Sequence, residues 1–474
     1  MREQKSQGLE HSMNNVYDTI IIGAGMSGLA AGIRLAMFDK KVLILEKHTI
    51  AGGLNSFYAR KGRKLDVGLH AMTNFAKKGE RGKPLTKLLK QLRIPYGELA
   101  LNEQQGSKII FPDTELSFSN DLNVFTDDVL EKFPEEKDGF MALLEDIRNF
   151  NEVSLDNPYE SAKERVARMI GDENLREMIF CPLLIYGSAW EDDMDFSQFV
   201  IMFKSIFLEG FSRPEGGVRR VISLLMKKYK ALGGEVRFRS GVNEIISENS
   251  VIKGVKLENG EVITASKVLS SIGYPETVSN LNEKIELDPK VGKLSFTETI
   301  LCYNKKPKDF GVEDTIVFYN ENQKYHYRRP STLFDEKSAV VCLPNNFEID
   351  DYEDGMIRLT FMANFDLWND LSPEEYDLEK EKVLTASKDI VRKLYPQMDE
   401  EPNFVDIFTP TTIKKFTSHH GGTVYGSTDK SRDGRTPIKG LYIIGTDQGF
   451  LGIVGAMLSG ISMANLHCLM EGSN

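Results

Sequence analysis

The sequence predicts an α/β fold with two domains. Between residues 16 and 45, an apolar strand-like run is followed by a glycine-rich turn, a helical stretch and a second strand-like run. Later segments alternate apolar strands with helices, among them a long helical pattern at residues 373–394. A chain of 474 residues also exceeds the size at which one hydrophobic core stops growing, about 250–300 residues. We therefore expect at least two domains, the first of which begins with this strand–helix–strand unit.

This first unit has the features of a dinucleotide-binding site. The apolar run Val16–Ile22 is followed at once by Gly23-Ala24-Gly25-Met26-Ser27-Gly28, a G-x-G-x-x-G turn. Its glycines allow a tight turn, the approach of a pyrophosphate to the backbone, and close packing of helix on strand. The helix N-terminus offers free N–H groups to the phosphates. The second strand ends in Glu46, whose carboxylate can accept hydrogen bonds from a ribose hydroxyl.

The residues after Glu46 indicate which dinucleotide is bound. Gly52-Gly53 follows after a short gap, and the whole stretch resembles the N-terminal fingerprint of FAD-binding oxidoreductases of the amine oxidase and phytoene desaturase superfamily. Two positions differ from that pattern: Asp39 replaces a usual glycine, and Leu54 stands where an arginine is frequent. Asp tolerates a left-handed backbone, so we expect the turn at Asp39 to survive. Besides the turn and Glu46, the resemblance implies cofactor contacts by Lys47, Gly52, Gly53, Leu54 and Asn55.

Two later blocks resemble the same superfamily. In the first, Pro214-Glu215-Gly216-Gly217 precedes a helical pattern and a strand beginning at Val242, which by resemblance lies against the adenosine. In the second, a strand ends in Gly445-Thr446-Asp447, and a helix of small residues starts with Gly452-Ile453-Val454. The resemblance implies that Asp447 bonds the ribityl chain or a phosphate, and that the last helix faces the pyrimidine end of the flavin.

Together the three blocks predict a Rossmann-like FAD-binding domain of the glutathione-reductase type, with an inserted mixed α+β substrate domain. The FAD-binding domain is expected to comprise residues 16–85, 212–285 and 418–474. The substrate domain is expected to comprise residues 86–211 and 286–417. Residues 72–93, basic and helical in pattern, are expected to leave the first domain, and the polar residues 1–15 are expected to form a disordered tail.

Composition excludes several other classes of protein. The net charge of −11 argues against nucleic-acid binding. The four cysteines lack C-x-x-C spacing, which favours neither disulfides nor zinc and predicts a cytoplasmic location. Adjacent His419 and His420 would point apart on a strand, so we expect no metal site. We expect no uninterrupted apolar run to be long enough to span a bilayer. The run that comes nearest to the required length is residues 199–211.

His70 is the candidate catalytic residue. It ends the segment Asp66-Val67-Gly68-Leu69-His70, which by resemblance leads to the flavin ring, although a hydrogen-bonded structural histidine is an equal alternative. Thr409-Pro410 and the stretch 422–426 resemble the retinol saturase and carotenoid isomerase branch. That branch implies an apolar polyene or isoprenoid substrate in a tunnel, exchanged with a membrane to which the protein attaches peripherally. Desaturation, saturation and cis–trans isomerisation remain open, and the sequence predicts no oligomeric state.

Two other classes of protein share this fold. A flavin amine oxidase would use an aromatic pair to guide its amine, but the two tryptophans, Trp190 and Trp368, lie outside the three FAD blocks. A prenyl-binding escort protein on the same fold would have a degraded glycine fingerprint, whereas this one is intact.

Overall fold

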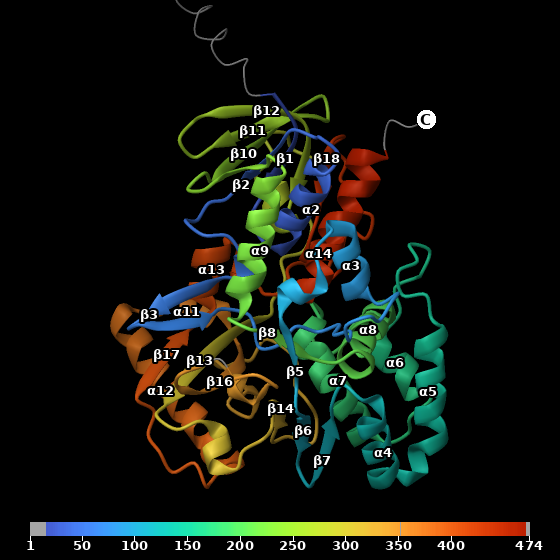
Figure 1. The fold of residues 1–474 in the computed structure, drawn as a ribbon, viewed down its shortest axis with the longest axis vertical. Helices are drawn as coiled ribbons and strands as arrows, with labels where there is room; N and C mark the ends of the chain where they lie inside the picture. Colours follow the sequence, from blue (N-terminus) through green and yellow to red (C-terminus); the bar gives the residue numbers. More distant parts are fainter. Residues whose placement is uncertain (1–15, 351, 471–474) are drawn as a thin grey trace, which may run out of the picture.

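The computed structural model describes residues 16–350 and 352–470, so the predicted tail at residues 1–15 lies outside the described residues. Figure 1 shows two lobes, each built on a seven-stranded sheet. The strands of the upper sheet come from residues 16–45, 235–270 and 441–443, and those of the lower sheet from residues 107–118 and 295–408.

The upper sheet has the order β10-β11-β12-β1-β2-β9, with β18 paired to β12. β1 runs parallel to both β2 and β12. Every residue of β2 is buried, because helices α2, α9 and α14 cover one face and side chains of β10, β11 and β12 pack on the other. α2 packs against α14 and α9. This arrangement confirms the predicted Rossmann-like fold. The elements are β1 (Val16–Ile22), α2 (Met26–Ala36), β2 (Val42–Leu45), α9 (Val218–Ala231), β9 (Glu235–Arg237), β10 (Val242–Glu248), β11 (Val251–Leu257), β12 (Val262–Ser270), β18 (Leu441–Ile443) and α14 (Gly452–Met463).

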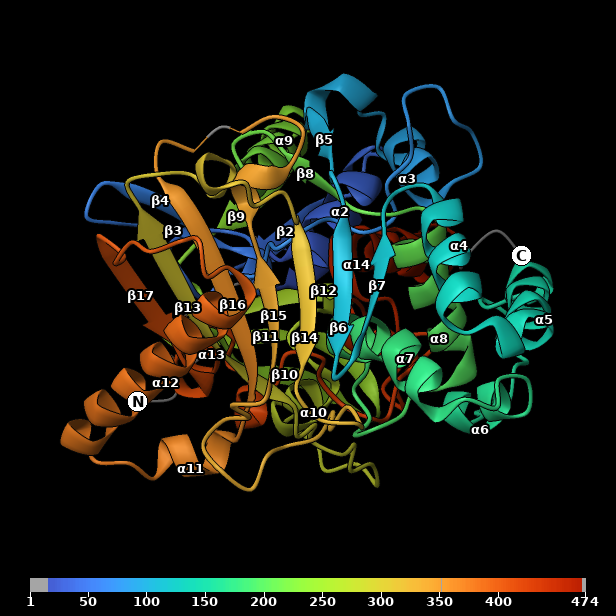
Figure 2. The same ribbon diagram turned by 90° about the horizontal axis from the view of Figure 1, so that it is seen from below.

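The lower sheet has the order β17-β13-β16-β15-β14-β6-β7 and is mostly antiparallel (Figure 2). Helices α4 to α8 gather beyond the β6–β7 end, whereas α12 and α13 lie at the β17 end. The strands are β6 (Ser107–Phe111), β7 (Thr114–Phe118), β13 (Ser295–Tyr303), β14 (Ile316–Asn320), β15 (Ser338–Cys342), β16 (Gly355–Ala363) and β17 (Phe404–Phe408). The helices are α4 (Leu122–Lys132), α5 (Lys137–Asn149), α6 (Ala162–Ala167), α7 (Glu173–Gly187), α8 (Phe196–Phe203), α11 (Phe365–Asn369), α12 (Pro373–Leu394) and α13 (Pro410–Thr417).

Short elements join the lobes. β3 (Phe57–Arg60) and β4 (Arg63–Asp66) form a hairpin, and β5 (Leu101–Glu103) pairs with β8 (Ser212–Pro214). α10 (Tyr274–Ser279) follows β12.

The prediction for residues 72–93 was wrong in two respects. Only α3 (Pro84–Leu92) is helical, and it packs against α2 and α14 rather than leaving the first domain. The reason is its narrow apolar face of four leucines, which joins the core beneath the upper sheet.

The prediction that no apolar stretch is long enough for a bilayer missed the last helix. α14 continues through a π-helical turn, so residues 452–469 form an 18-residue helix that passes a membrane-span test by length and composition. Of this stretch, 61% is buried inside the protein, where a Cβ on Gly460 would lie 2.1 Å from the Ser27 carbonyl oxygen. Such close packing on α2 makes it a core helix of the upper lobe.

Candidate active site

A cavity of about 540 Å³ lies between the lobes and collects residues from all three predicted FAD blocks and from the lower sheet. Its volume is in the range of cofactor and small-molecule sites. The following predicted site residues line it: Gly23, Gly25, Ser27, Glu46, Lys47, Gly52, Gly53, Leu54, Asn55, His70, Val242, Gly445, Gly452 and Ile453. Ala24, Gly28, Asp447 and Val454 do not.

The glycine turn forms an open cradle at one end of the cavity. Gly25 caps α2 without a side-chain hydrogen bond, and a Cβ at this position would meet nothing within 4 Å. The first N–H groups of α2 are thus accessible to a phosphate. Gly28 has a different task, since its Cβ would lie 2.1 Å from the Gly23 carbonyl oxygen. It permits helix packing and makes no contact with the cavity.

Glu46 holds this cradle and still has capacity for a ligand. Its carboxylate accepts hydrogen bonds from the backbone N–H groups of Ala24, at 2.8 Å, and His48, at 2.9 Å. A carboxylate offers about four lone-pair sites, so roughly two remain for ribose hydroxyls. The contribution of Ala24 is therefore indirect, because its N–H orients Glu46.

A second helix N-terminus reaches the same cavity. α14 begins after Leu451, which provides no side-chain cap, and Gly452 and Ile453 line the cavity. Asp447, by contrast, is 1% exposed and accepts hydrogen bonds from the N–H groups of Tyr274 and Ser427 and from Lys430. Its carboxylate thus fixes the turn that carries α14, and we do not propose it as a cofactor ligand.

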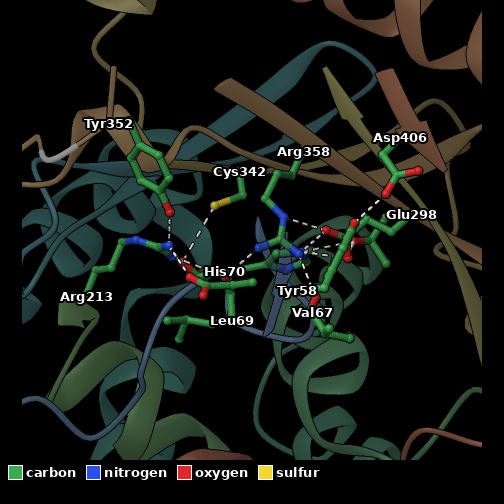
Figure 3. Close-up of polar contacts among 12 residues, drawn as sticks. Tyr58, Val67, Leu69, His70, Arg213, Glu298, Cys342, Tyr352, Arg358 and Asp406 are labelled. Carbon is green, nitrogen blue, oxygen red and sulfur yellow. Dashed lines mark hydrogen bonds and ion pairs between the residues drawn. The ribbon is translucent and has the colours of Figure 1, made fainter. Parts of the chain in front are cut away.

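The segment 66–70 is held by two buried arginines (Figure 3). β4 ends at Asp66, which pairs with Arg213 at 2.5 Å. Arg213 also donates to the carbonyl oxygen of Leu69 at 3.2 Å. Arg358, from the lower sheet, donates to the same oxygen at 2.8 Å and to that of Val67 at 2.6 Å. The backbone that leads to His70 is therefore fixed from both lobes.

His70 enters the cavity beside a buried carboxylate. Its Nε2 lies 3.3 Å from Oε2 of Glu298 and 3.1 Å from Oγ1 of Thr360. Arg358 pairs with the other oxygen of Glu298 at 2.5 Å. Burial alone would raise the pKa of Glu298, but Arg358 and His70 together hold that pKa below its usual range. The carboxylate is thus ionised and accepts the Nε2–H of His70, which leaves Nδ1 as the nitrogen available for a reaction.

The sequence interpretation missed Glu298, Arg358 and Thr360. Glu298 lies on β13 and Arg358 on β16, two strands in which all nine residues are buried. Glu298 is opposite Thr360 in the register, and Arg358 is two pairs further along, opposite Ile300. The available signal was one charge of opposite sign in each of two otherwise uncharged apolar runs, because buried charges occur in pairs.

Beyond His70 the cavity wall is apolar. Helices α7 and α8, the lower sheet and the 424–425 turn contribute Ile185, Tyr186, Met202, Phe296, Val340, Val424 and Tyr425. Trp190 and Trp368 do not line this cavity, so the aromatic pair expected for an amine oxidase is not built from tryptophan. His420 lines it, but His419 bonds the Thr423 carbonyl, and no cluster of three metal-binding side chains was found in residues 16–350 and 352–470.

Residues 26–466 match the family of flavin-containing amine oxidoreductases. The chain belongs to this family. Prolycopene isomerase, chloroplastic, of Arabidopsis thaliana is 26% identical, over 95% of this chain and 82% of that protein. All-trans-retinol 13,14-reductase of Rattus norvegicus is 22% identical, over 93% of this chain and 84% of that protein. A solved oxidoreductase from Methanosarcina mazei has a TM-score of 0.65 at 18% identity, over 94% of this chain and 99% of its own.

The predicted family, fold class and cofactor are therefore confirmed: the protein is an FAD-dependent oxidoreductase. The cavity fits FAD by its own geometry. It offers two uncapped helix N-termini, an open glycine cradle and a carboxylate with free lone pairs. These groups would hold the phosphates and ribose of FAD.

Proposed function

We propose that this enzyme acts on an apolar polyene or isoprenoid substrate of the carotenoid or retinoid type. The observation that carries the proposal is the continuity of one cavity, which joins the glycine cradle to an apolar wall with His70 between them. The names of the two relatives, an isomerase of prolycopene and a reductase of retinol, support a polyene. Flavin supplies hydride or electron exchange with such a substrate, in desaturation, saturation or isomerisation.

We assign His70 the role of acid–base group. With Nε2–H donated to Glu298 and Thr360, its Nδ1 can accept or return a proton at the substrate or hold negative charge nearby. Ile185, Met202 and Val340 line this part of the cavity with apolar side chains that offer water no hydrogen bond. A proton held there exchanges with the substrate rather than with solvent.

An apolar substrate of this kind resides in membranes. We therefore propose peripheral, reversible attachment of a cytoplasmic protein to a bilayer, through apolar side chains of the substrate domain.

The proposal is tested with the purified, FAD-loaded enzyme. Oxidised and dithionite-reduced forms are mixed with carotenoids, retinoids and amines, and flavin absorbance and product isomers are followed. Flavin reduction by a polyene identifies desaturation, reoxidation by a polyene identifies saturation, and a geometric change without net redox identifies isomerisation. Reduction by amines alone, with every polyene inert, would refute the proposal in favour of an amine oxidase.

A further inference from the structure

A second, smaller hollow of about 90 Å³ opens between the lobes beside the main cavity. Its floor comes from the end of α7, from α8 and from residues 428–432 and 448–451. Its rim is the loop after α5, where Val153, Leu155 and Tyr159 are each more than half exposed. Three large apolar side chains exposed within seven residues of one loop are an unusual concentration for a monomer surface.

Only a thin wall separates this groove from the main cavity. Leu451 lines both hollows. On α7, Tyr186 lines the cavity and its neighbour Gly187 lines the groove; on α8, Met202 lines the cavity and Ile201 the groove. A Cβ on Gly187 would lie 2.4 Å from Sδ of Met202, so the two residues touch. The wall thus consists of a residue without a side chain, an unbranched flexible methionine and one leucine, none of which is hydrogen-bonded through its side chain.

The charged side chains of the groove are neutralised within the protein. Glu152 pairs with Lys204 at 2.7 Å, and Arg432 pairs with Asp195 at 3.0 Å. The remaining charge that lines the groove, Lys430, pairs with Asp447 at 3.0 Å. A groove that offers no uncompensated charge suits a neutral, apolar ligand better than an amine.

The groove is also preformed. Arg432 donates to the carbonyl oxygen of Asn157 at 2.6 Å and lies 4.0 Å over the ring of Tyr159. Asn157 in turn bonds Ser197 on α8 at 3.2 Å. These contacts tie the rim loop to both lobes, so the hollow does not depend on a bound ligand to keep its shape.

From these observations we infer that the groove is the entrance by which the apolar substrate passes from a lipid surface to the cavity, with Leu451 and Met202 as the movable wall. This inference rests on the proposed function, because it requires an apolar substrate. Its distinct content is the route: substrate slides under residues 152–159 and passes between α8 and the start of α14.

The test follows the transfer of all-trans-retinol from phosphatidylcholine vesicles to the FAD-loaded protein, by stopped-flow measurement of retinol fluorescence. Ile201→Trp fills the groove without touching the main cavity, and we expect it to slow the transfer about tenfold or more. The retinol bound at equilibrium and the FAD content should remain near wild type. Val153→Asp with Leu155→Asp places charge on the rim and should slow transfer from vesicles in the same way.

A matched control is the double variant Val124→Asp with Met141→Asp. These residues are exposed on α4 and α5 of the same lobe and line neither hollow. The control should transfer retinol at the wild-type rate. If Ile201→Trp fails to fold, as judged by flavin absorbance, the transfer rate of the rim variant (Val153→Asp with Leu155→Asp) tests the entrance instead. Wild-type rates in the groove variants overturn the entrance alone, whereas a wild-type protein that takes up neither retinol nor any other polyene overturns the proposed function as well.

Discussion

Replacing Glu298 by glutamine should lower turnover as strongly as removing His70, while FAD stays bound. In the structure, Nε2 of His70 faces the acceptors Glu298 and Thr360 and therefore carries the proton. Glu298→Gln keeps the shape of the side chain but presents an amide that can donate. The imidazole then no longer has a strong acceptor to hold its proton on Nε2. Nδ1 is therefore no longer kept unprotonated, and it cannot accept a proton from the substrate. We expect turnover to fall by roughly 10²–10⁴, the range for a lost acid–base group, as for His70→Ala.

The same substitution should also reduce stability. Glu298 and Arg358 are both nearly inaccessible to solvent and form an ion pair. Removing one partner of such a pair costs about 3–5 kcal/mol, because the other charge remains buried. The new amide retains one oxygen that can accept from Arg358, so we place the loss at the low end, about 3 kcal/mol.

This stability difference should depend on pH in a defined direction. The pKa of Glu298 is lowered in the folded protein, where Arg358 and His70 outweigh burial. A lowered folded pKa contributes stability above the unfolded value, about 4.3, and this contribution is lost as pH falls through the folded pKa. Denaturant unfolding should therefore show the largest gap between wild type and Glu298→Gln at neutral pH, and the gap should close below about pH 4.

Glu177→Gln is the matched control. Glu177 on α7 is also buried, pairs with Lys163 at 2.8 Å and accepts from the Tyr325 N–H at 3.1 Å, but does not line the cavity. It should lose stability with no change in turnover or FAD content. Wild-type turnover in Glu298→Gln with intact folding would refute the role of Glu298, and equal losses in both variants would reduce that role to general stability.

Three further predictions concern the cofactor and the membrane. Glu46→Ala removes one or two charge-assisted bonds of about 1.5–3 kcal/mol each and should weaken FAD binding roughly tenfold or more, measured by titration of the apoprotein. Gly28→Ala forces a Cβ to within 2.1 Å of the Gly23 carbonyl oxygen and should yield colourless or insoluble protein. Gly97→Ala, where a Cβ meets nothing within 4 Å, should purify yellow as its control. In flotation with phosphatidylcholine vesicles, part of the wild-type protein should rise with the lipid, and protein that always stays in the soluble fraction would contradict membrane attachment.

The FAD cradle could be predicted from sequence because its parts are local. Gly23, Gly25 and Glu46 lie in one strand–helix–strand unit, where a short motif determines the backbone path. The same reasoning did not apply to Asp447, whose partners Tyr274 and Ser427 come from other segments of the chain. A motif indicates that a carboxylate follows a strand, but only the folded chain shows which donors reach it first.

The contact between His70 and Glu298 could not be predicted from the sequence at all. It spans 228 positions and depends on the register of β13 against β16, which a single sequence does not determine. The prediction for α3 was wrong for a related reason. The sequence shows the apolar face of this helix but not the hydrophobic core against which that face packs. Local patterns thus predicted the glycine turn and the carboxylate that meet in the cradle, whereas the long-range pairing of β13 with β16 determines which side chains surround His70.

The two arginines that hold the segment 66–70 link the local cradle to the long-range contacts of the lower sheet. Arg213 adjoins the upper lobe through β8 and Arg358 belongs to the lower sheet, yet both donate to the carbonyl oxygen of Leu69. The hydrogen bonds from Arg358 form only when the lower sheet is packed against this segment. The position of His70 relative to the glycine cradle therefore depends on the docking of the two lobes. Because the substrate wall and the cofactor cradle share this one strip of backbone, loosening the lower sheet at Arg358 should displace the acid–base group before it displaces FAD.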